Sequence, residues 1–201
     1  MSEQNTVVSE KQCPEHLRAN RSAFSQWFGR SILKVLGWRV EGQIPNLERI
    51  LIIGAPHTSN WDFVIAMATA LGLNIRLRWL GKHTIFKPGA VRLLKWLGGI
   101  PVNRSKPLDI VSHISNLVER ERGIVIALTP EGTRKKVDKW KTGFLRMAEA
   151  IDCNVFMIGL DFAGKRVVLG KIFEPTGDHG ADLTAIMKYY KRYNGKFPNQ
   201  E

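Results

Sequence analysis

Short apolar runs alternate with helical patterns along most of the chain, an order that neither an all-helical nor an all-β fold accommodates. Runs typical of buried strands occupy residues 50–53, 75–80, 123–128, 155–160 and 167–173. Between and after them, the spacing of apolar residues predicts helices over residues 61–72, 91–97, 108–122, 142–151 and 183–192. This alternation predicts one α/β domain over residues 38–201, with a mostly parallel or mixed sheet flanked by helices. Binding residues of such sheets lie on loops at the carboxyl ends of strands.

The N-terminal region differs from this domain. Residues 1–20 are polar and contain no signal-peptide core, and we expect them to form a disordered or loose tail. Residues 21–37 predict an amphipathic helix that ends at Gly37, with basic residues beside an apolar face that includes Trp27 and Phe28. Such a helix suits a membrane surface, and packing on the domain's own core is the alternative. The longest charge-free apolar run, residues 63–75, is too short to span a bilayer.

The chain is strongly basic, with a net charge of +12 over 201 residues. Residues 76–141 contain 15 Lys or Arg and 5 Asp or Glu, so most of the excess lies in that segment. A basic surface favours anionic partners such as nucleic acid, anionic lipid, acidic carrier proteins or phosphorylated small molecules. The two cysteines, Cys13 and Cys153, form neither a zinc-binding spacing nor a disulfide framework, which fits a reducing cytoplasmic setting.

His57 and Asp62 are the first candidate pair of catalytic residues. The apolar run 50–53 leads through Gly-Ala-Pro to His57, and either Ser59 or Asn60 is suited to begin the following helix. Asp62 then falls in the first helical turn, within reach of Nδ1 of His57, which leaves Nε2 to accept a proton. Because the sequence contains no Gly-x-Ser-x-Gly motif, we expect a substrate hydroxyl to be the nucleophile. A histidine that only caps the helix is the alternative.

Two further segments carry arginines at the ends of loops. Residues 98–104 contain two glycines that permit close backbone approach and end at Arg104. Residues 129–134 follow the apolar run 123–128, contain Gly132 for a turn, and end at Arg134. Further lysines follow Arg134, and such a cationic rim is suited to a phosphate. A solvated surface turn is the alternative for each segment.

Residues 50–162 resemble the glycerolipid acyltransferase family of the 1-acylglycerol-3-phosphate acyltransferase type. The resemblance lies in three motifs in this order: His-x4-Asp, Gly-x-Pro-x-x-Arg and Pro-Glu-Gly-Thr-Arg. The resemblance implies that His57 and Asp62 are the catalytic pair. It also implies a set of residues that bind the acceptor and its phosphate: Arg104, Glu131, Gly132, Thr133 and Arg134. Two departures concern the acceptor, because Thr129 stands where the family often has an aromatic residue and residues 155–158 lack the family's proline.

The resemblance further implies transfer of a fatty acyl group from acyl-CoA or acyl carrier protein to the hydroxyl of a lysophospholipid or related lysolipid. It implies no metal and no permanently bound cofactor. It favours a membrane role for residues 21–37, on anionic lipid at the cytoplasmic face of the membrane. We do not expect a nucleic-acid partner. The alternatives are a basic nucleic-acid-binding protein, a non-catalytic membrane-surface adaptor, and a thioester hydrolase that uses water as the acceptor.

Overall fold

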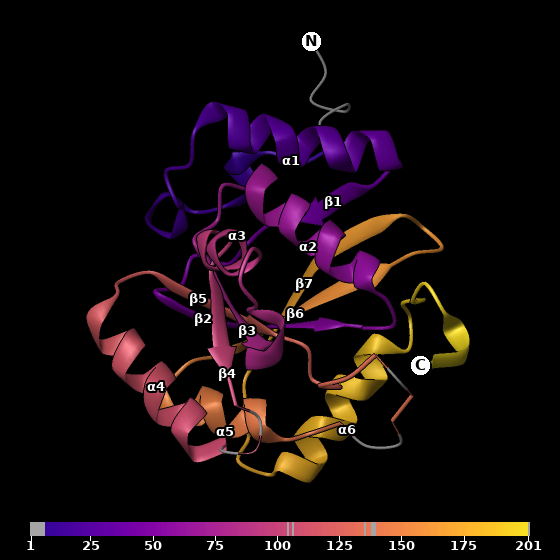
Figure 1. Cartoon of the computed structure of the whole chain (residues 1–201). Helices are drawn as coiled ribbons and strands as arrows, with labels where there is room; N and C mark the ends of the chain where they lie inside the picture. The colour runs from indigo at the N-terminus through magenta and orange to yellow at the C-terminus, as the bar shows by residue number, and fades with distance from the viewer. Residues whose placement is uncertain (1–6, 104, 106, 135, 138–139, 201) are drawn as a thin grey trace.

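The chain folds into a single α/β domain built on one mixed sheet (Figure 1). The computed structural model describes residues 7–103, 105, 107–134, 136–137 and 140–200. Seven strands lie within these residues: β1 (Arg39–Gly42), β2 (Arg49–Ala55), β3 (Leu77–Lys82), β4 (Gly99–Val102), β5 (Ile124–Leu128), β6 (Val155–Asp161) and β7 (Arg166–Phe173). Their order is β1-β7-β6-β2-β5-β3-β4, and every neighbouring pair is parallel except β6 and β7. The predicted fold class is confirmed.

Helices cover both faces of this sheet (Figure 1). Their bounds are α1 (Ala23–Leu36), α2 (Asn60–Gly72), α3 (Val91–Trp96), α4 (Pro107–Arg120), α5 (Gly143–Ala150) and α6 (His179–Tyr190). Successive side chains of a strand point to opposite faces, and β2 therefore divides the core. Its Ile50 and Ile52 pack on the side of α1 and α2, whereas Leu51 and Ile53 pack on the side of α4, α5 and α6.

Two of the strands were not predicted from the sequence. β1 is a short strand at one edge of the sheet, and its neighbouring strand is β7. β4 occupies the first part of residues 98–104, which were expected to form a binding loop. Among the described strands it pairs only with β3, at the opposite edge of the sheet. This explains how Pro101 is accommodated, because an edge strand tolerates a residue without an N–H donor.

The prediction of a loose tail over residues 1–20 is wrong for residues 7–20. Val8, Cys13 and Leu17 are buried in the core on the α1 side of the sheet. The backbone N–H of Val40 donates to the carbonyl of Val7 at 2.9 Å, and that of Ile44 donates to the carbonyl of Gln12 at 2.8 Å. These three residues are widely spaced in a polar segment, so they form no periodic pattern that would predict a buried element. Residues 1–6 lie outside the described part of the chain.

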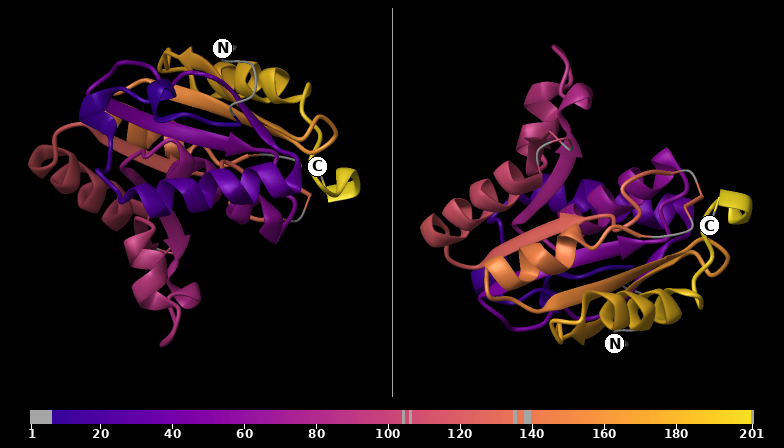
Figure 2. Two further views of the ribbon diagram at one scale, coloured as in Figure 1. Left: turned by 90° about the horizontal axis from the view of Figure 1, so that it is seen from above. Right: turned by 90° about the horizontal axis from the view of Figure 1, so that it is seen from below.

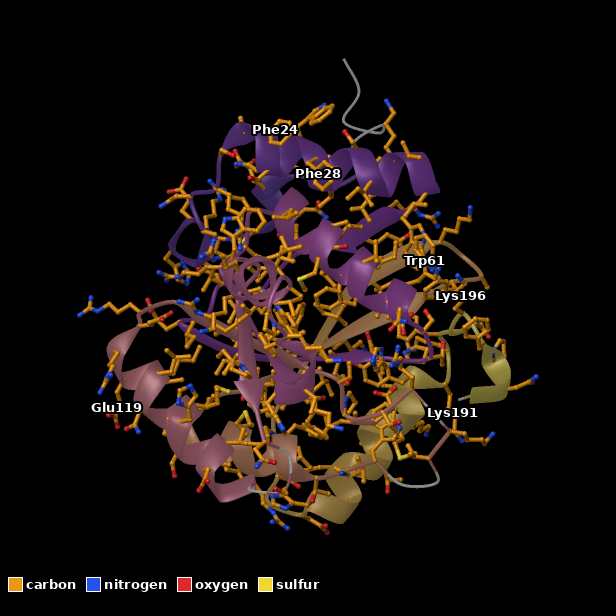
Figure 3. The ribbon with its side chains drawn as sticks, in the orientation of Figure 1. Phe24, Phe28, Trp61, Glu119, Lys191 and Lys196 are labelled. Atoms are coloured by element: carbon orange, nitrogen blue, oxygen red, sulfur yellow. The ribbon has the colours of Figure 1, made fainter. Side chains whose placement is uncertain are left out.

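Helix α1 packs on the domain with one side and exposes the other. Gly29 lies against α2 so closely that a Cβ atom there would be 2.6 Å from the carbonyl oxygen of Ala68, and Leu33 is fully buried. The opposite side exposes Phe24, Trp27, Phe28 and Val35. Phe24 and Phe28 are labelled on this helix in Figure 3. The helix therefore packs on the core of the domain, which was the alternative to a membrane role, and it also keeps an exposed aromatic face. Among the described residues, no helix has both the length and the apolar character needed to cross a bilayer.

Candidate active site

The first part of the site is the loop between β2 and α2, at the carboxyl end of β2. α2 begins after Ser59, whose hydroxyl accepts the backbone N–H of Trp61 at 3.2 Å. Asp62 lies in the first helical turn and completes a capping box by accepting the N–H of Ser59. The sequence placed His57 on this loop and Asp62 in this turn, and the structure confirms both positions. Of the two residues predicted to begin this helix, Ser59 and Asn60, Ser59 is its N-cap.

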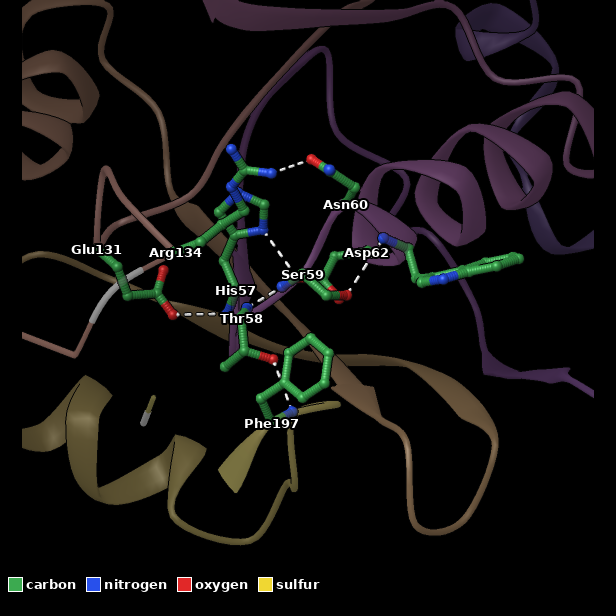
Figure 4. Close-up of polar contacts among 9 residues, drawn as sticks. His57, Thr58, Ser59, Asn60, Asp62, Glu131, Arg134 and Phe197 are labelled. Atoms are coloured by element: carbon green, nitrogen blue, oxygen red, sulfur yellow. Dashed lines mark hydrogen bonds and ion pairs between the residues drawn. The ribbon is translucent and has the colours of Figure 1, made fainter. Parts of the chain in front are cut away.

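The carboxylate of Asp62 fixes the ring of His57 (Figure 4). Nδ1 of His57 is 2.9 Å from Oδ2 of Asp62, and this carboxylate is only 2% exposed. It also accepts the backbone N–H groups of Thr58 and Ser59, each at 2.8 Å, and the Ser59 hydroxyl at 2.7 Å. A carboxylate accepts hydrogen bonds and does not donate them. His57 therefore carries its hydrogen on Nδ1, toward Asp62, and Nε2 is left as an acceptor. The pair therefore has the arrangement of a general base and its orienting acid.

Glu131 holds the backbone of this loop from the other side. Its Oε1 accepts the N–H of His57 at 3.0 Å, and its side chain is buried (Figure 4). Its Oε2 has no hydrogen-bond partner among the described residues. Burial raises the pKa of Glu131 to about 7, although its hydrogen bonds with the backbone oppose this rise. The resemblance implied that Glu131 binds the acceptor, whereas the structure places it behind His57 and not among the residues that line the cavity.

The raised pKa of Glu131 predicts a pH-dependent stability. The pKa of Glu131 in the folded protein, about 7, lies above the ordinary value of 4.5. The contribution of this shift to stability is therefore fully present below pH 4.5 and is lost as the pH rises through 7. The loss is at most about 3 kcal/mol in the free energy of unfolding. We expect this loss in the wild type and not in Glu131→Gln, as measured by urea unfolding at pH 5 and pH 7.5. Equal losses in the two proteins would contradict the assignment.

Arg134 and Gly132 come from the loop after β5, the strand next to β2. Gly132 has a φ of 64°, a conformation that favours glycine, and it lets the loop turn back toward α2. Arg134 is exposed, and its Nη1 donates to the Oδ1 of Asn60 at the start of α2 (Figure 4). The structure thus brings Gly132, Thr133 and Arg134 to the rim beside His57. Arg104 lies outside the described residues.

The C-terminal segment reaches the same loop, which the sequence did not indicate. The backbone N–H of Phe197 donates to the hydroxyl of Thr58 at 3.2 Å (Figure 4). The ammonium of Lys196 lies 4.7 Å from the centre of the Trp61 ring, on the first turn of α2. These contacts join residues about 135 positions apart, and no local pattern marks them. The chain end therefore supports the loop that carries His57.

A cavity of about 820 Å³ leads from this polar rim into the domain between α2 and the sheet. His57, Asn60, Asp62 and Arg134 line one part of it. Phe63, Ala66, Met67 and Ala70 of α2 and its C-cap residue Leu73 also line it. These five residues recur along one side of the helix over a length of about 15 Å, since a helix rises about 1.5 Å per residue. The volume falls in the range of about 300–1,000 Å³ that is usual for ligand pockets, and its interior is apolar.

The described residues give little support to two other kinds of site. No group of three or more His, Cys, Asp or Glu among them is arranged to hold a metal ion. A nucleic-acid-binding site would require exposed aromatic side chains in the basic segment, residues 76–141, on which bases could stack. Residues 76–141 contain four aromatic residues, Trp79, Phe86, Trp96 and Trp140. Trp79 is buried, Phe86 and Trp140 are half-buried, and Trp96 is exposed.

Comparisons with known proteins agree with this geometry. A family model described as Acyltransferase matches residues 37–160, which include His57, Asp62 and the loop that ends at Arg134. No curated protein matches the sequence. The fold is similar to the crystal structure of the 1-acyl-sn-glycerophosphate (LPA) acyltransferase PlsC from Thermotoga maritima. That match has a TM-score of 0.56 and 19% sequence identity, and it covers 84% of this chain and 76% of that chain.

Proposed function

Because the chain belongs to the Acyltransferase family, we propose that it transfers a fatty acyl group from a thioester to the hydroxyl of a lysophospholipid. The donor is acyl-CoA or acyl carrier protein, and the acceptor is of the 1-acylglycerol-3-phosphate type. The observation that carries this proposal is an oriented His57–Asp62 pair at the polar end of a deep apolar cavity. The name of the similar PlsC structure supports the same acceptor class.

In the proposed mechanism, Nε2 of His57 accepts the proton of the acceptor hydroxyl as its oxygen attacks the thioester carbonyl. The new C–O bond forms a tetrahedral intermediate, and Asp62 stabilises the imidazolium that results. The C–S bond then breaks, and the imidazolium returns its proton to the departing thiolate. The ester and the free thiol are the products. The N–H groups of Thr58 and Ser59 are engaged by Asp62, so they serve to hold the base rather than to bind the carbonyl oxygen.

The two ends of the cavity suit the two parts of a lipid substrate. The apolar interior fits an acyl chain, whose burial is favourable by about 0.8 kcal/mol per methylene group. The guanidinium of Arg134 at the rim offers a planar pair of donors to a phosphate. Glu131 acts through the backbone of His57 and is a positioning residue in this scheme.

Filling the cavity should change the preferred acyl chain. Ala70 lines the cavity from the last turn of α2, and Ala70→Phe adds a ring there. We expect the variant to prefer shorter chains, with turnover of long-chain donors reduced about tenfold or more relative to short ones. The measurement is competition among thioesters of graded length, with Ala70→Ser as the control of nearly unchanged volume. An unchanged chain-length profile in Ala70→Phe would show that the chain lies elsewhere.

The function itself is tested by acyl transfer in vitro. Purified protein is incubated with labelled acyl-CoA, or with acyl carrier protein, and with a panel of lysolipids that differ in head group. The proposal expects a diacyl product that requires the lysolipid. Release of free fatty acid at the same rate without any acceptor would instead identify a thioester hydrolase. Lipid mass spectrometry after overexpression should show the same lysolipid falling and its diacyl product rising.

The exposed aromatic side of α1 is proposed to bind the membrane that carries the substrates. Phe24, Trp27 and Phe28 form this side, and their removal from water at an interface is favourable. We expect Trp27→Ser to weaken binding to anionic liposomes about tenfold without affecting thermal unfolding. High salt should reduce the binding of the wild type only in part, because apolar contact is not screened. Flotation of Trp27→Ser equal to that of the wild type would exclude α1 as an anchor.

A further inference from the structure

A projecting arm connects β3 to the edge strand β4. It comprises residues 83–98, with the short helix η4 (His83–Ile85) at its start and α3 near its end. In both views of Figure 2 this segment extends away from the body of the domain. Three large apolar side chains of the arm are exposed to water, namely Ile85 at 46%, Leu93 at 57% and Trp96 at 51%.

The arm is also cationic. Lys87, Arg92 and Lys95 of the arm are exposed, and so is Lys82, which ends β3 directly before it. The sequence contains no acidic residue between Arg76 and Leu108, so these positive charges have no carboxylate near them in the chain. Exposed apolar side chains interspersed with Lys and Arg are typical of segments that lie in the interface of an anionic membrane.

The exposure of these side chains does not result from loose packing of the arm. Its inner residues Phe86, Leu94 and Leu97 pack against the core. The ring of Phe86 stacks on Trp79 with centres 5.7 Å apart, and the indole N–H of Trp79 donates to the carbonyl of Leu97 at 3.2 Å. The arm is therefore held firmly from inside while its outer side has no apolar partner in the described structure.

Arg21, just before α1, joins the arm to the N-terminal helix. Its guanidinium lies 4.7 Å from the centre of the Trp96 ring and donates to the carbonyl of Trp96 at 3.2 Å. The arm also borders the cavity, because Ile85 and Leu94 line it together with Val64 of α2. The arm thus contacts the segment just before α1 and forms part of the wall of the cavity.

We propose that the arm is a second membrane contact, which inserts Ile85, Leu93 and Trp96 into the interface of an anionic bilayer. Its cations Lys87, Arg92 and Lys95 then lie at the level of the lipid phosphates, and the cavity wall formed by the arm faces lipid. The inference that a lipid substrate enters beside the arm rests on the proposed function. The binding of the arm to the bilayer does not, since it depends only on exposed apolar area and charge.

Vesicle binding of the full chain tests the arm directly. Leu93→Ser is compared with Ile172→Ser, which removes a similarly exposed apolar side chain from β7, near the opposite edge of the sheet. The probe is vesicles of phosphatidylcholine and phosphatidylglycerol in equal parts. We expect Leu93→Ser to weaken binding about tenfold and Ile172→Ser to leave it unchanged. Replacing Arg92 and Lys95 by Ser should weaken binding about fivefold per charge on these vesicles and not on pure phosphatidylcholine.

Equal binding by Leu93→Ser, Ile172→Ser and the wild type would overturn the proposal. The proposal would also be overturned if replacing Arg92 and Lys95 weakened binding to acyl carrier protein and left vesicle binding unchanged. The arm would then bind an acidic protein. Acyl transfer to a dispersed acceptor without vesicles should be unchanged in Leu93→Ser. If the wild type transfers no acyl group in any assay, the proposed function fails while the vesicle result still decides the role of the arm.

Discussion

His57→Ala is expected to reduce acyl transfer by about 10²- to 10⁴-fold, the usual cost of removing a general base. The substitution removes the imidazole that Asp62 orients, so the acceptor hydroxyl attacks without activation. The backbone N–H of residue 57 still donates to Glu131, and Asp62 keeps its three other donors. We therefore expect the fold to persist, with turnover measured by labelled acyl transfer and folding measured by circular dichroism.

A matched control for this experiment is His113→Ala. His113 is exposed on α4, on the other face of the sheet, and its loss should leave turnover unchanged. Near-normal turnover in a folded His57→Ala protein would show that His57 only caps the helix. The bond between His57 and Asp62 would then be structural, and another group would have to activate the hydroxyl.

Arg134→Ala is expected to remove most of the activity, and Arg134→Lys to retain part of it. Lysine keeps the charge but loses the planar fork that pairs with two phosphate oxygens. The loss should appear in the KM of the acceptor if the contact is equal in the ground and transition states. It should appear in kcat if the contact holds the hydroxyl against His57. Two-substrate kinetics of the three proteins measure both constants, and the KM of the donor should change little.

Two further variants isolate the role of Arg134. Lys136→Ala removes an exposed positive charge from the same loop without removing the fork, and it should have a small effect. Asn60→Ala removes the side chain that accepts from Arg134, and it should reproduce part of the loss if Asn60 orients the guanidinium. If Arg134→Ala raises only the KM of the donor, the arginine binds the phosphates of the donor and the acceptor site lies elsewhere.

Local sequence was enough to predict the parts of the molecule whose interactions are local. The alternation of apolar runs predicted the sheet, because strand and helix periodicity depend on neighbouring residues. The loop at His57 was equally readable. Its helix cap at Ser59 and its carboxylate at Asp62 lie within five residues of the histidine, so spacing alone brings them together.

Contacts between distant segments could not be read in this way. Glu131 was expected at the acceptor, yet it lies behind His57 because β5 pairs directly with β2 and brings its loop to the same edge of the sheet. The bond from Phe197 to Thr58 joins the chain end to the site and has no local signal. Nor did the polar N-terminal segment indicate that Val8 and Leu17 would be buried.

The sequence by itself determined the α/β class, the His57–Asp62 pair and the basic, partly apolar character of the segment around α3, since each depends on composition or short spacing. The tertiary structure decided which apolar residues would be covered. It buried Leu33 and left Phe24 exposed on one helix, and it turned Leu94 inward and Leu93 outward on another. Burial depends on which surfaces meet when the sheet and helices pack, and a cavity exists only where they meet incompletely.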